Sequence, residues 1–192
     1  GKYGDTERRF FQIKGKYIVC PVKSGLMLID QKRAHERILY EKFIESLSRH
    51  TPVSQIELFP VLIEIEAADH SLLREIEGDL RSLGFVLQFR EKNKVIIKGR
   101  PSDSALADPK EMLDILIEEY KSTQAGPSAG AKENLAGAMA SASAIPYGKT
   151  LSQNEIEDLF DKLFACSAPN YSPGGKPVIT IISIEELDGK FR

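Results

Sequence analysis

The sequence predicts an α+β fold in which an α/β-type external unit surrounds a smaller inserted α+β unit. The chain opens with three short apolar runs and then a long stretch of helical periodicity, which is typical of strands followed by a helix. Residues 61–121 read strand, helix, strand, strand, helix, an order that can form a small core by itself. Residues 122–131 are rich in Gly, Ser, Ala and Pro and predict a flexible loop. We therefore expect residues 1–54 and 122–192 to form the external unit, with residues 55–60 as a connecting peptide.

The external unit is expected to begin with an antiparallel meander. The apolar runs Phe10–Ile13, Tyr17–Val22 and Leu26–Ile29 predict its three strands, and the glycines between them favour tight turns. Apolar residues then recur at helical spacing from Gln31 to Arg49, and the Thr51-Pro52 pair ends this helix.

In the insert, the alternation of apolar and acidic residues over Val61–Glu66 predicts a strand. Asp69 or Ser71 is expected to cap the helix that follows. Two further strands, Phe85–Phe89 and Val95–Lys98, and a helix from about Pro109 to Tyr120 complete the unit.

Beyond the flexible loop, residues 132–145 predict an Ala-rich helix whose small side chains allow close backbone approach. Ser152 and Glu155 have the spacing of a capping box and predict the start of another helix. The continuous apolar run Val178–Ile182 is typical of a strand in the centre of a sheet.

The composition indicates a cytoplasmic globular protein. Hydrophobic residues make up 42% and charged residues 28%, and the formal net charge of -2 gives no general attraction to nucleic acid or to an anionic membrane. No apolar run is long enough to cross a bilayer, and we expect no signal peptide. The two cysteines, Cys20 and Cys166, lie far apart and favour a reduced protein. The first residue is glycine, and we expect the chain to be one domain of a longer protein.

The residues that follow the third strand carry the strongest functional signal. Asp30 stands where the strand gives way to the helix, and its carboxylate can accept hydrogen bonds from the unpaired amides of the first turn. The stretch from this residue onward resembles the DQHA-x2-E-x4-E motif in the C-terminal domain of the DNA mismatch repair protein MutL. The matching positions are Asp30, Gln31, Glu36 and Glu41, and the motif's histidine and alanine are here Lys32 and Arg33.

The resemblance covers nearly the whole chain, and it rests on several features that occur in the family's order. Phe11-Gln12-Ile13 with Tyr17-Ile18 is similar to the opening strand pair, and Ser152–Leu163 is similar to the helix before the final loop. The loop Ser172–Pro177 resembles the family's CPHGRP motif, and Phe191-Arg192 resembles its FxR ending.

The resemblance implies a homodimer whose interface lies in the external unit, with the insert as a regulatory unit. The implied partners are a second copy of the chain, the sliding clamp and the mismatch-recognition protein MutS, with at most a weak DNA contact and no membrane. ATP and magnesium would belong to the N-terminal domain of the full-length protein, so we expect no cofactor in these residues. The apolar strands and the Ala-rich helix separately predict a large apolar surface, which either forms the dimer contact or packs within the monomer.

Nuclease members of the family hold zinc- or manganese-like ions near this motif. Their ligands are the motif's histidine and first glutamate, with thiols and an imidazole from later loops, a donor set that suits zinc. In this chain the histidine is Lys32, whose ammonium cannot act as a ligand. The cysteine and histidine of the CPHGRP-like loop are Ser172 and Gly174, and another cysteine position of the family is Ser141.

We therefore expect a remnant motif with no bound metal and no catalytic residue, in which Lys32 pairs with Glu36. The alternative is a magnesium or manganese site made only of carboxylates, from Asp30, Glu36 and Glu41.

The connecting peptide Gln55-Ile56-Glu57-Leu58-Phe59 resembles the short bacterial peptide that binds the sliding clamp. Leu58 and Phe59 would fill an apolar pocket on the clamp, and Gln55 would fix the register by hydrogen bonds. The alternative is that the apolar residues of this segment face the core of the chain itself.

Other polar residues carry weaker signals. Lys92, Lys94, Lys98 and Arg100 form a basic cluster that either contacts a DNA phosphate or is a solvated hairpin. His50 and His70 lie near the ends of predicted elements and are expected to be surface or capping residues.

The sequence thus predicts a homodimerising, partner-recruiting domain of a MutL-type mismatch repair protein without chemistry of its own. One alternative is a metal-dependent nicking endonuclease, which plasmid nicking with manganese and its loss in Glu36→Ala would reveal. Another alternative, independent of the resemblance, is an α+β domain that senses a small molecule through the insert.

Overall fold

The computed structural model describes residues 9–52, 54–104, 108–124 and 130–192, and it confirms the α+β class. The chain divides into two compact units, one from residues 1–38 and 145–192 and the other from residues 39–144.

These bounds differ from the predicted ones, because the second unit also takes in the C-terminal part of the first helix and the Ala-rich helix. Leu39, Phe43 and Leu47 of the first helix belong to the hydrophobic core of the second unit, as do Leu135 and Met139 of the Ala-rich helix. A break between strands and helices in the sequence therefore does not coincide with the break between the units.

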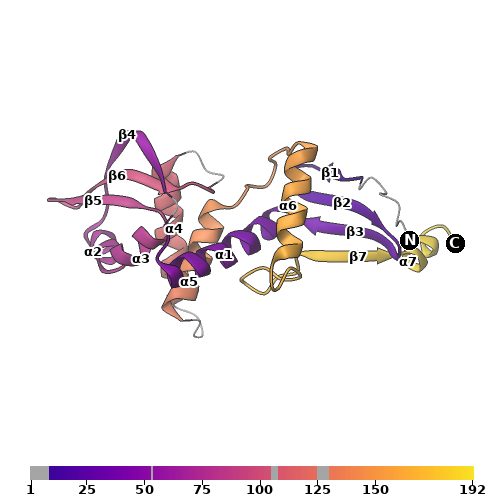
Figure 1. Cartoon of the computed structure of the whole chain (residues 1–192). Coiled ribbons are helices and arrows are strands. Elements are labelled where there is room, and N and C mark those ends of the chain that lie inside the picture. Colours follow the sequence, from indigo (N-terminus) through magenta and orange to yellow (C-terminus); the bar gives the residue numbers. More distant parts are fainter. Residues whose placement is uncertain (1–8, 53, 105–107, 125–129) are drawn as a thin grey trace. The chain divides into compact units, whose positions relative to one another are not determined.

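The first unit contains an antiparallel sheet in the order β1-β2-β3-β7 (Figure 1). The strands β1 (Phe11–Ile13), β2 (Tyr17–Val22) and β3 (Gly25–Asp30) form the predicted meander. The fourth strand, β7 (Ile179–Ser183), pairs with β3 along one edge, so the prediction of a central position for this run is wrong.

A glycine is needed where β3 meets β7. A Cβ atom on Gly25 would lie 2.0 Å from the backbone oxygen of Ile182, and the φ angle of Gly25 is 151°, so a side chain is excluded by both contact and backbone conformation.

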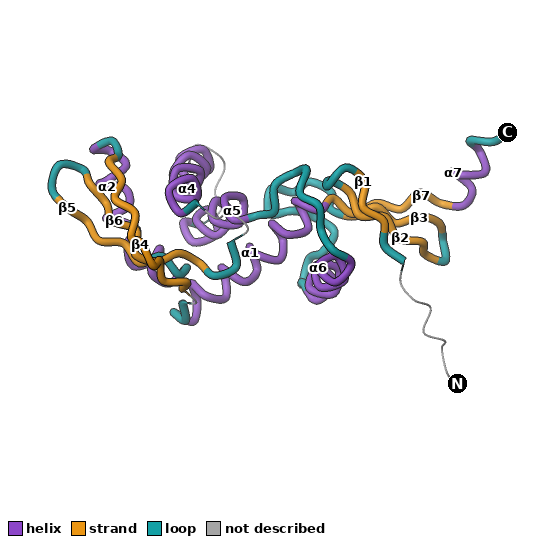
Figure 2. The backbone as a smooth tube through the Cα atoms, turned by 90° about the horizontal axis from the view of Figure 1, so that it is seen from above, coloured by secondary structure: helices purple, strands orange, loops and turns teal. Residues whose placement is uncertain are grey.

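One face of this sheet is covered by α6 (Gln153–Ala165), as Figure 2 shows from above. The predicted capping box is present, since the Ser152 hydroxyl accepts from the Glu155 amide and the Glu155 carboxylate accepts from the Ser152 amide. Ile156, Leu159 and Leu163 are buried on the inner side of the helix. A second capping box, which sequence reasoning did not find, starts α7 (Ile184–Gly189) at Ser183.

The helix α1 (Gln31–Arg49) begins directly after β3, as predicted. It ends at His50, which has a left-handed φ of 52° and whose Nδ1 lies 3.2 Å from the hydroxyl of Ser82. His50 is exposed, as expected for a surface residue.

The second unit contains the sheet β4-β6-β5, formed by β4 (Ser54–Glu64), β6 (Lys94–Pro101) and β5 (Val86–Arg90). Its helices are α2 (Ala67–Glu75), α3 (Glu77–Ser82), α4 (Pro109–Gln124) and α5 (Ala131–Ser143). The predicted single helix after β4 is thus two short ones, and its N-cap is Glu66 rather than Asp69 or Ser71. Residues 125–129 of the predicted flexible loop lie outside the described residues, whereas residues 122–124 continue α4 and Ala131 begins α5.

The Ala-rich helix α5 is buried within this unit. Ala136, Ala138, Ala140 and Ala142 are almost inaccessible and join the same hydrophobic core as Met112 and Leu116 of α4. The small side chains therefore serve packing within one chain, and the prediction that this helix adds to a dimer contact is wrong.

In the described part of the chain, no helix combines the length and the apolar character that crossing a membrane requires.

Candidate functional site

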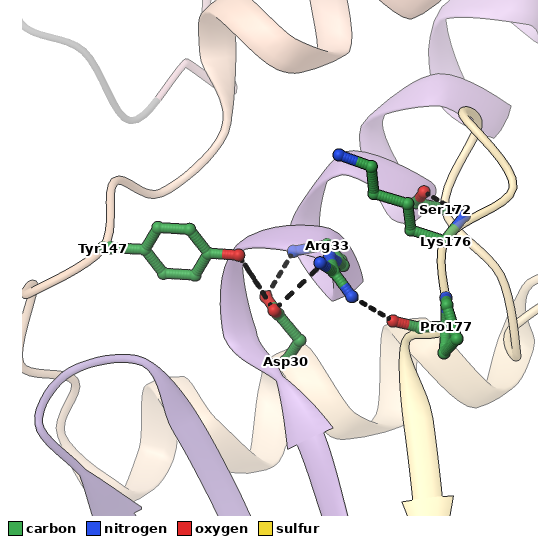
Figure 3. A network of polar contacts seen from close by, with 6 residues as sticks. All are labelled: Asp30, Arg33, Tyr147, Ser172, Lys176 and Pro177. Atoms are coloured by element: carbon green, nitrogen blue, oxygen red, sulfur yellow. Dashed lines mark hydrogen bonds and ion pairs between the residues drawn. The ribbon is translucent and has the colours of Figure 1, made fainter.

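Asp30 lies at the end of β3 and is almost fully buried, with 7% of its surface exposed. Its Oδ1 accepts a hydrogen bond of 3.1 Å from the amide of Arg33, so the carboxylate caps α1 as expected. The hydroxyl of Tyr147 donates to the same carboxylate, with distances of 2.8 Å to Oδ2 and 3.1 Å to Oδ1 (Figure 3).

Arg33 joins this carboxylate to the loop that resembles the CPHGRP motif. Its Nε lies 3.5 Å from Asp30 Oδ2, and its Nη1 donates to the carbonyl of Pro177 at 2.9 Å (Figure 3). One helical turn later, Arg37 Nε donates to the carbonyl of Tyr171 at 2.7 Å. Two arginines of α1 therefore donate hydrogen bonds to backbone carbonyl groups at both ends of this loop.

The hydroxyl of Ser172 is used inside this loop. Ser172 is buried, and its Oγ accepts a hydrogen bond of 3.1 Å from the amide of Lys176, while its own amide donates to the carbonyl of Lys176 at 2.8 Å. A cysteine at this position of the family would hold a metal, whereas the serine here closes a turn.

The pKa of Tyr147 is raised to about 12, first by burial and then by its hydrogen bond to Asp30 and the charge of that carboxylate. The phenol is therefore a hydrogen-bond donor to Asp30 throughout the physiological pH range.

The loop that carries Tyr147 is held by two glutamines. Gln31 is fully buried, and its Nε2 donates to the carbonyl of Lys149 at 3.0 Å. Gln12 Nε2 donates to the same carbonyl at 3.0 Å and also to Gln31 Oε1. The glutamine of the DQHA-like motif thus positions a loop rather than a substrate.

The expected partner of Lys32 is Glu36, and the structure also brings the Lys32 ammonium near an aromatic ring. The ammonium of Lys32 lies 5.7 Å from the centroid of the Tyr147 ring, and the ammonium of Lys16 lies 5.0 Å from it. The cation in contact with Asp30 is Arg33, which replaces the alanine of the family motif and not its histidine.

These residues do not fit a zinc or manganese ion. Within the described ranges, no group of three or more His, Cys, Asp or Glu residues is arranged so that it could hold a metal. The Asp30 carboxylate already accepts from a phenol and an amide and lies next to a guanidinium. His35, beside Glu36 in sequence, uses its Nδ1 to accept from the amide of Ile145 at 2.9 Å.

A hollow of about 340 Å³ lies beside the Asp30 network. Tyr17, Leu28 and Thr180 of the sheet line it together with Tyr147. The hydrogen-bond network of Asp30 therefore lies next to the face of the sheet to which Tyr17, Leu28 and Thr180 point.

That side of the sheet is mostly apolar, and none of the described helices of the first unit covers it (Figure 2). The register pairs Phe11 with Val19, Val19 with Leu28 and Leu28 with Thr180, so these side chains point to one face. Ile13 shares this face, and 59% of Phe11 and 47% of Ile13 are exposed. We call Phe11, Ile13, Tyr17, Leu26, Leu28 and Ile182 the open sheet face. Val19 lies between them but is only 6% exposed.

The opposite face is closed by α6. Ile18 and Ile29 lie opposite each other on β2 and β3 and are each 1% exposed. Phe10 packs its ring 5.1 Å from that of Phe160 on α6. The sheet of the first unit is therefore covered by α6 over β2 and β3 on one face, and its other face is the open sheet face.

The clamp-like peptide lies within β4, at an irregularity in its pairing with β6. Gln55 and Ile56 are paired with Arg100 and Gly99, and regular pairing resumes only at Val61. Between these points the side chains of Leu58 and Phe59 are 91% and 85% exposed. The alternative, that Ile56, Leu58 and the following Leu62 face the core, is wrong, because Ile56 is 65% and Leu62 is 59% exposed as well.

The predicted basic cluster is only partly available for a ligand. Arg100 Nε donates to Glu57 Oε1 at 2.7 Å, and both side chains are largely buried. Lys92 lies in the β5–β6 turn, and His70 lies on α2 with its ring 5.3 Å from that of Phe89.

Tyr147 and Gln12 are the site residues that sequence reasoning missed. Tyr147 follows Pro146 in an irregular loop, and its contact with Asp30 joins residues 117 positions apart. A single sequence carries no periodic signal for such a contact.

Comparison with known proteins agrees with this geometry. The sequence model of the family described as the MutL C terminal dimerisation domain matches residues 10–151. A DNA mismatch repair protein MutL from Chloroherpeton thalassium is 40% identical over 185 residues, covering 96% of this chain and 29% of that protein. A MutL from Chlorobium phaeobacteroides is 37% identical over 188 residues, covering 98% of this chain and 30% of that protein.

The open sheet face indicates that this chain is a domain for association with another protein chain. The chain belongs to the MutL C-terminal dimerisation domain family of DNA mismatch repair proteins. It spans about 30% of the length of the curated relatives that it matches.

Proposed function

We propose that this domain joins two copies of a MutL chain through the open sheet face. The observation that carries the proposal is that this apolar face lies opposite the face closed by α6 and leaves Phe11 and Ile13 about half exposed. Contiguous exposed apolar side chains on a sheet mark an association surface in soluble proteins. A second copy supplies the matching apolar face, because a two-fold contact uses the same patch on both chains.

The edge strand β7 supports the same proposal. It is apolar on both of its sides, with Ile181 46% exposed on the side of α6 and Ile182 on the open face. Such a pattern is usual in a strand that is covered from both sides. A partner chain at this edge supplies the cover that one chain lacks.

Sedimentation velocity of Phe11→Glu tests the proposal. The variant places a carboxylate in the apolar contact, and we expect the dimer to weaken by about 2 kcal/mol or more, roughly thirtyfold in dissociation constant. Leu62→Glu is the matched control, because Leu62 is also 59% exposed but lies in β4 of the second unit.

The outcomes are distinct. A dimer that is lost in Phe11→Glu and kept in Leu62→Glu supports the open sheet face. A wild-type chain that sediments as a monomer at every concentration, or a dimer unchanged by Phe11→Glu, contradicts it.

We infer that the domain acts as a scaffold and performs no chemistry. Arg33 stands next to the one buried carboxylate of the motif, and its guanidinium already supplies the positive charge that a metal would bring. ATP and magnesium then belong to the N-terminal part of the full-length protein. Joining two such chains raises the effective concentration of their distant parts for each other. A cytoplasmic location stays an expectation from the sequence.

We also propose that the β4 irregularity recruits the sliding clamp. Leu58 and Phe59 are the anchors that such a peptide needs, and both project into solvent. The ion pair of Glu57 with Arg100 ties the base of the segment to β6, so the two anchors are presented from a fixed backbone. Recruitment of MutS stays an expectation from the family.

A further inference from the structure

A hollow of about 650 Å³ opens in the second unit, at the end of the β5–β6 hairpin that faces α2. Arg74 of α2, Arg90 of β5 and Lys92 of the turn line it with three positive charges. The only carboxylate among its described lining residues is Glu91. This hollow is distinct from the Asp30 network and from the clamp-like peptide.

The guanidinium of Arg74 is held over an aromatic ring. Its Cζ lies 5.4 Å from the centroid of the Phe89 ring, which is a cation–π arrangement. When a guanidinium stacks on a ring, its N–H groups point away from the ring in the guanidinium plane. Two of these N–H groups can then donate to two oxygens of one phosphate. Arg74 is exposed on its other side, so a ligand reaches it from solvent.

His70 supplies a polar atom that the protein does not satisfy. Its ring stands edge-on to Phe89 at 86°, and its Nε2 is buried without a hydrogen-bond partner in the described part of the chain. Buried polar atoms nearly always have a partner, so His70 Nε2 is an unsatisfied group next to the hollow.

The turn that closes the hollow has an unusual backbone. Lys92 and Asn93 both adopt left-handed conformations, with φ angles of 57° and 55°. Asparagine tolerates this region, but lysine is not among the residues that a turn of this kind favours. Lys92 places one more ammonium at the rim of the hollow.

We propose that this hollow binds a phosphate group of a nucleic acid backbone or of a free nucleotide. The three cations supply the charge, and the stacked Arg74 supplies a bidentate donor. The inference is independent of dimerisation and of clamp binding, since it uses only α2 and the β5–β6 hairpin. It also differs from the basic cluster predicted by sequence, because Arg100 is engaged by Glu57 and Arg74 comes from another element.

Binding of the purified whole chain to a short fluorescein-labelled DNA duplex, followed by anisotropy over a range of salt, tests the proposal. We expect Arg74→Gln and Lys92→Gln each to weaken binding by about tenfold, because each removes a charged contact. Each change should also lower the slope of log K against log salt by about 0.9. Glu91→Gln removes the opposing charge and should tighten binding.

Lys98→Gln is the matched control. Lys98 is an exposed cation of β6 in the same sheet, but it does not line the hollow, so its loss should leave affinity nearly unchanged. Circular dichroism melting checks that every variant is folded, which we expect because Arg74, Lys92, Glu91 and Lys98 are all exposed.

Competition separates the two sources of phosphate. Displacement of the duplex by unlabelled DNA but not by inorganic phosphate or ATP identifies the backbone of a nucleic acid. Binding of ATP that is lost in Arg74→Gln, with no duplex binding, identifies a free nucleotide and also supports the site. Equal losses in Arg74→Gln and Lys98→Gln, or weaker binding in Glu91→Gln, would overturn it.

Discussion

Asp30 accepts from the amide of Arg33 and the hydroxyl of Tyr147 and also pairs with the Arg33 guanidinium, so two residues of the first unit contact its carboxylate. The amide of Arg33 belongs to the helix that Asp30 begins, and the Arg33 guanidinium reaches on to the loop before β7. Tyr147 arrives from the loop before α6. The carboxylate, together with Arg33, therefore holds three segments of the first unit together.

We predict that Tyr147→Phe lowers the free energy of unfolding at neutral pH by about 1 kcal/mol or less, because it removes one partly exposed hydrogen bond. The folded pKa of about 12 exceeds the unfolded value of about 10, so this contribution is complete below pH 10 and disappears as the pH rises toward 12. Urea unfolding of both proteins across this range measures the difference.

Comparison of the wild type with Tyr147→Phe also tests whether the hydrogen bond to Asp30 raises the pKa of Tyr147. Ultraviolet titration of the folded wild type should contain a late-ionising phenol that is missing from the titration of Tyr147→Phe. If the two titrations differ by a phenol that ionises at the ordinary tyrosine pKa, the hydrogen bond to Asp30 does not hold in solution.

At the scale of single residues, the prediction that Asp30 caps the helix is confirmed. The sequence did not identify the cation that contacts Asp30, because Lys32 and Arg33 are neighbours on one helix and only the fold decides which one points to Asp30. Tyr147 was out of reach for the same reason, since nothing local links it to β3.

Among the elements, β4 shows how an interruption of regular pairing creates an accessible surface. The strand pairs with β6 on both sides of the irregularity, and Leu58 and Phe59 between them lie outside the core. Alternation along the sequence cannot show this, because the number of residues opposite β6 changes at the irregularity.

We predict that Phe59→Ala weakens binding to a purified sliding clamp by at least about tenfold and changes the free energy of unfolding by less than about 0.5 kcal/mol. The reason is that Phe59 is 85% exposed and packs little against its own chain. Surface plasmon resonance and thermal melting measure the two quantities.

Leu62→Ala serves as the control, because Leu62 is an exposed apolar residue of the same strand outside the motif. Clamp affinity that falls equally in both variants points to a general apolar contact. A marked loss of stability in Phe59→Ala contradicts the exposed conformation of the segment.

The helices and the meander were predictable from periodicity and capping residues, because both signals are local. The positions of β7 and α5 were not predictable in the same way. Apolar residues on both sides of β7 suggested a central strand, and small residues on α5 suggested a contact between chains. The apolar residues of β7 and the small residues of α5 indicate that these surfaces are covered. They do not show whether the same chain or a partner chain covers them.

At the scale of the whole chain, the two units differ in what remains open. The second unit encloses a continuous core that includes part of α1 and all of the contact between α4 and α5. The first unit closes one face of its sheet with α6 and leaves the other uncovered by its own helices. Family membership assigns dimerisation to the domain, and this asymmetry places the contact on the open sheet face in our proposal.

Hydroxyl-radical footprinting at protein concentrations below and above dimer formation tests this placement most directly. We predict that Phe11 and Ile13 lose reactivity as the dimer forms, because their exposed surface becomes buried, while Leu58 and Phe59 stay reactive in the same samples. If Phe11 and Ile13 keep their reactivity in a chain that has demonstrably dimerised, the contact lies elsewhere and the account is wrong.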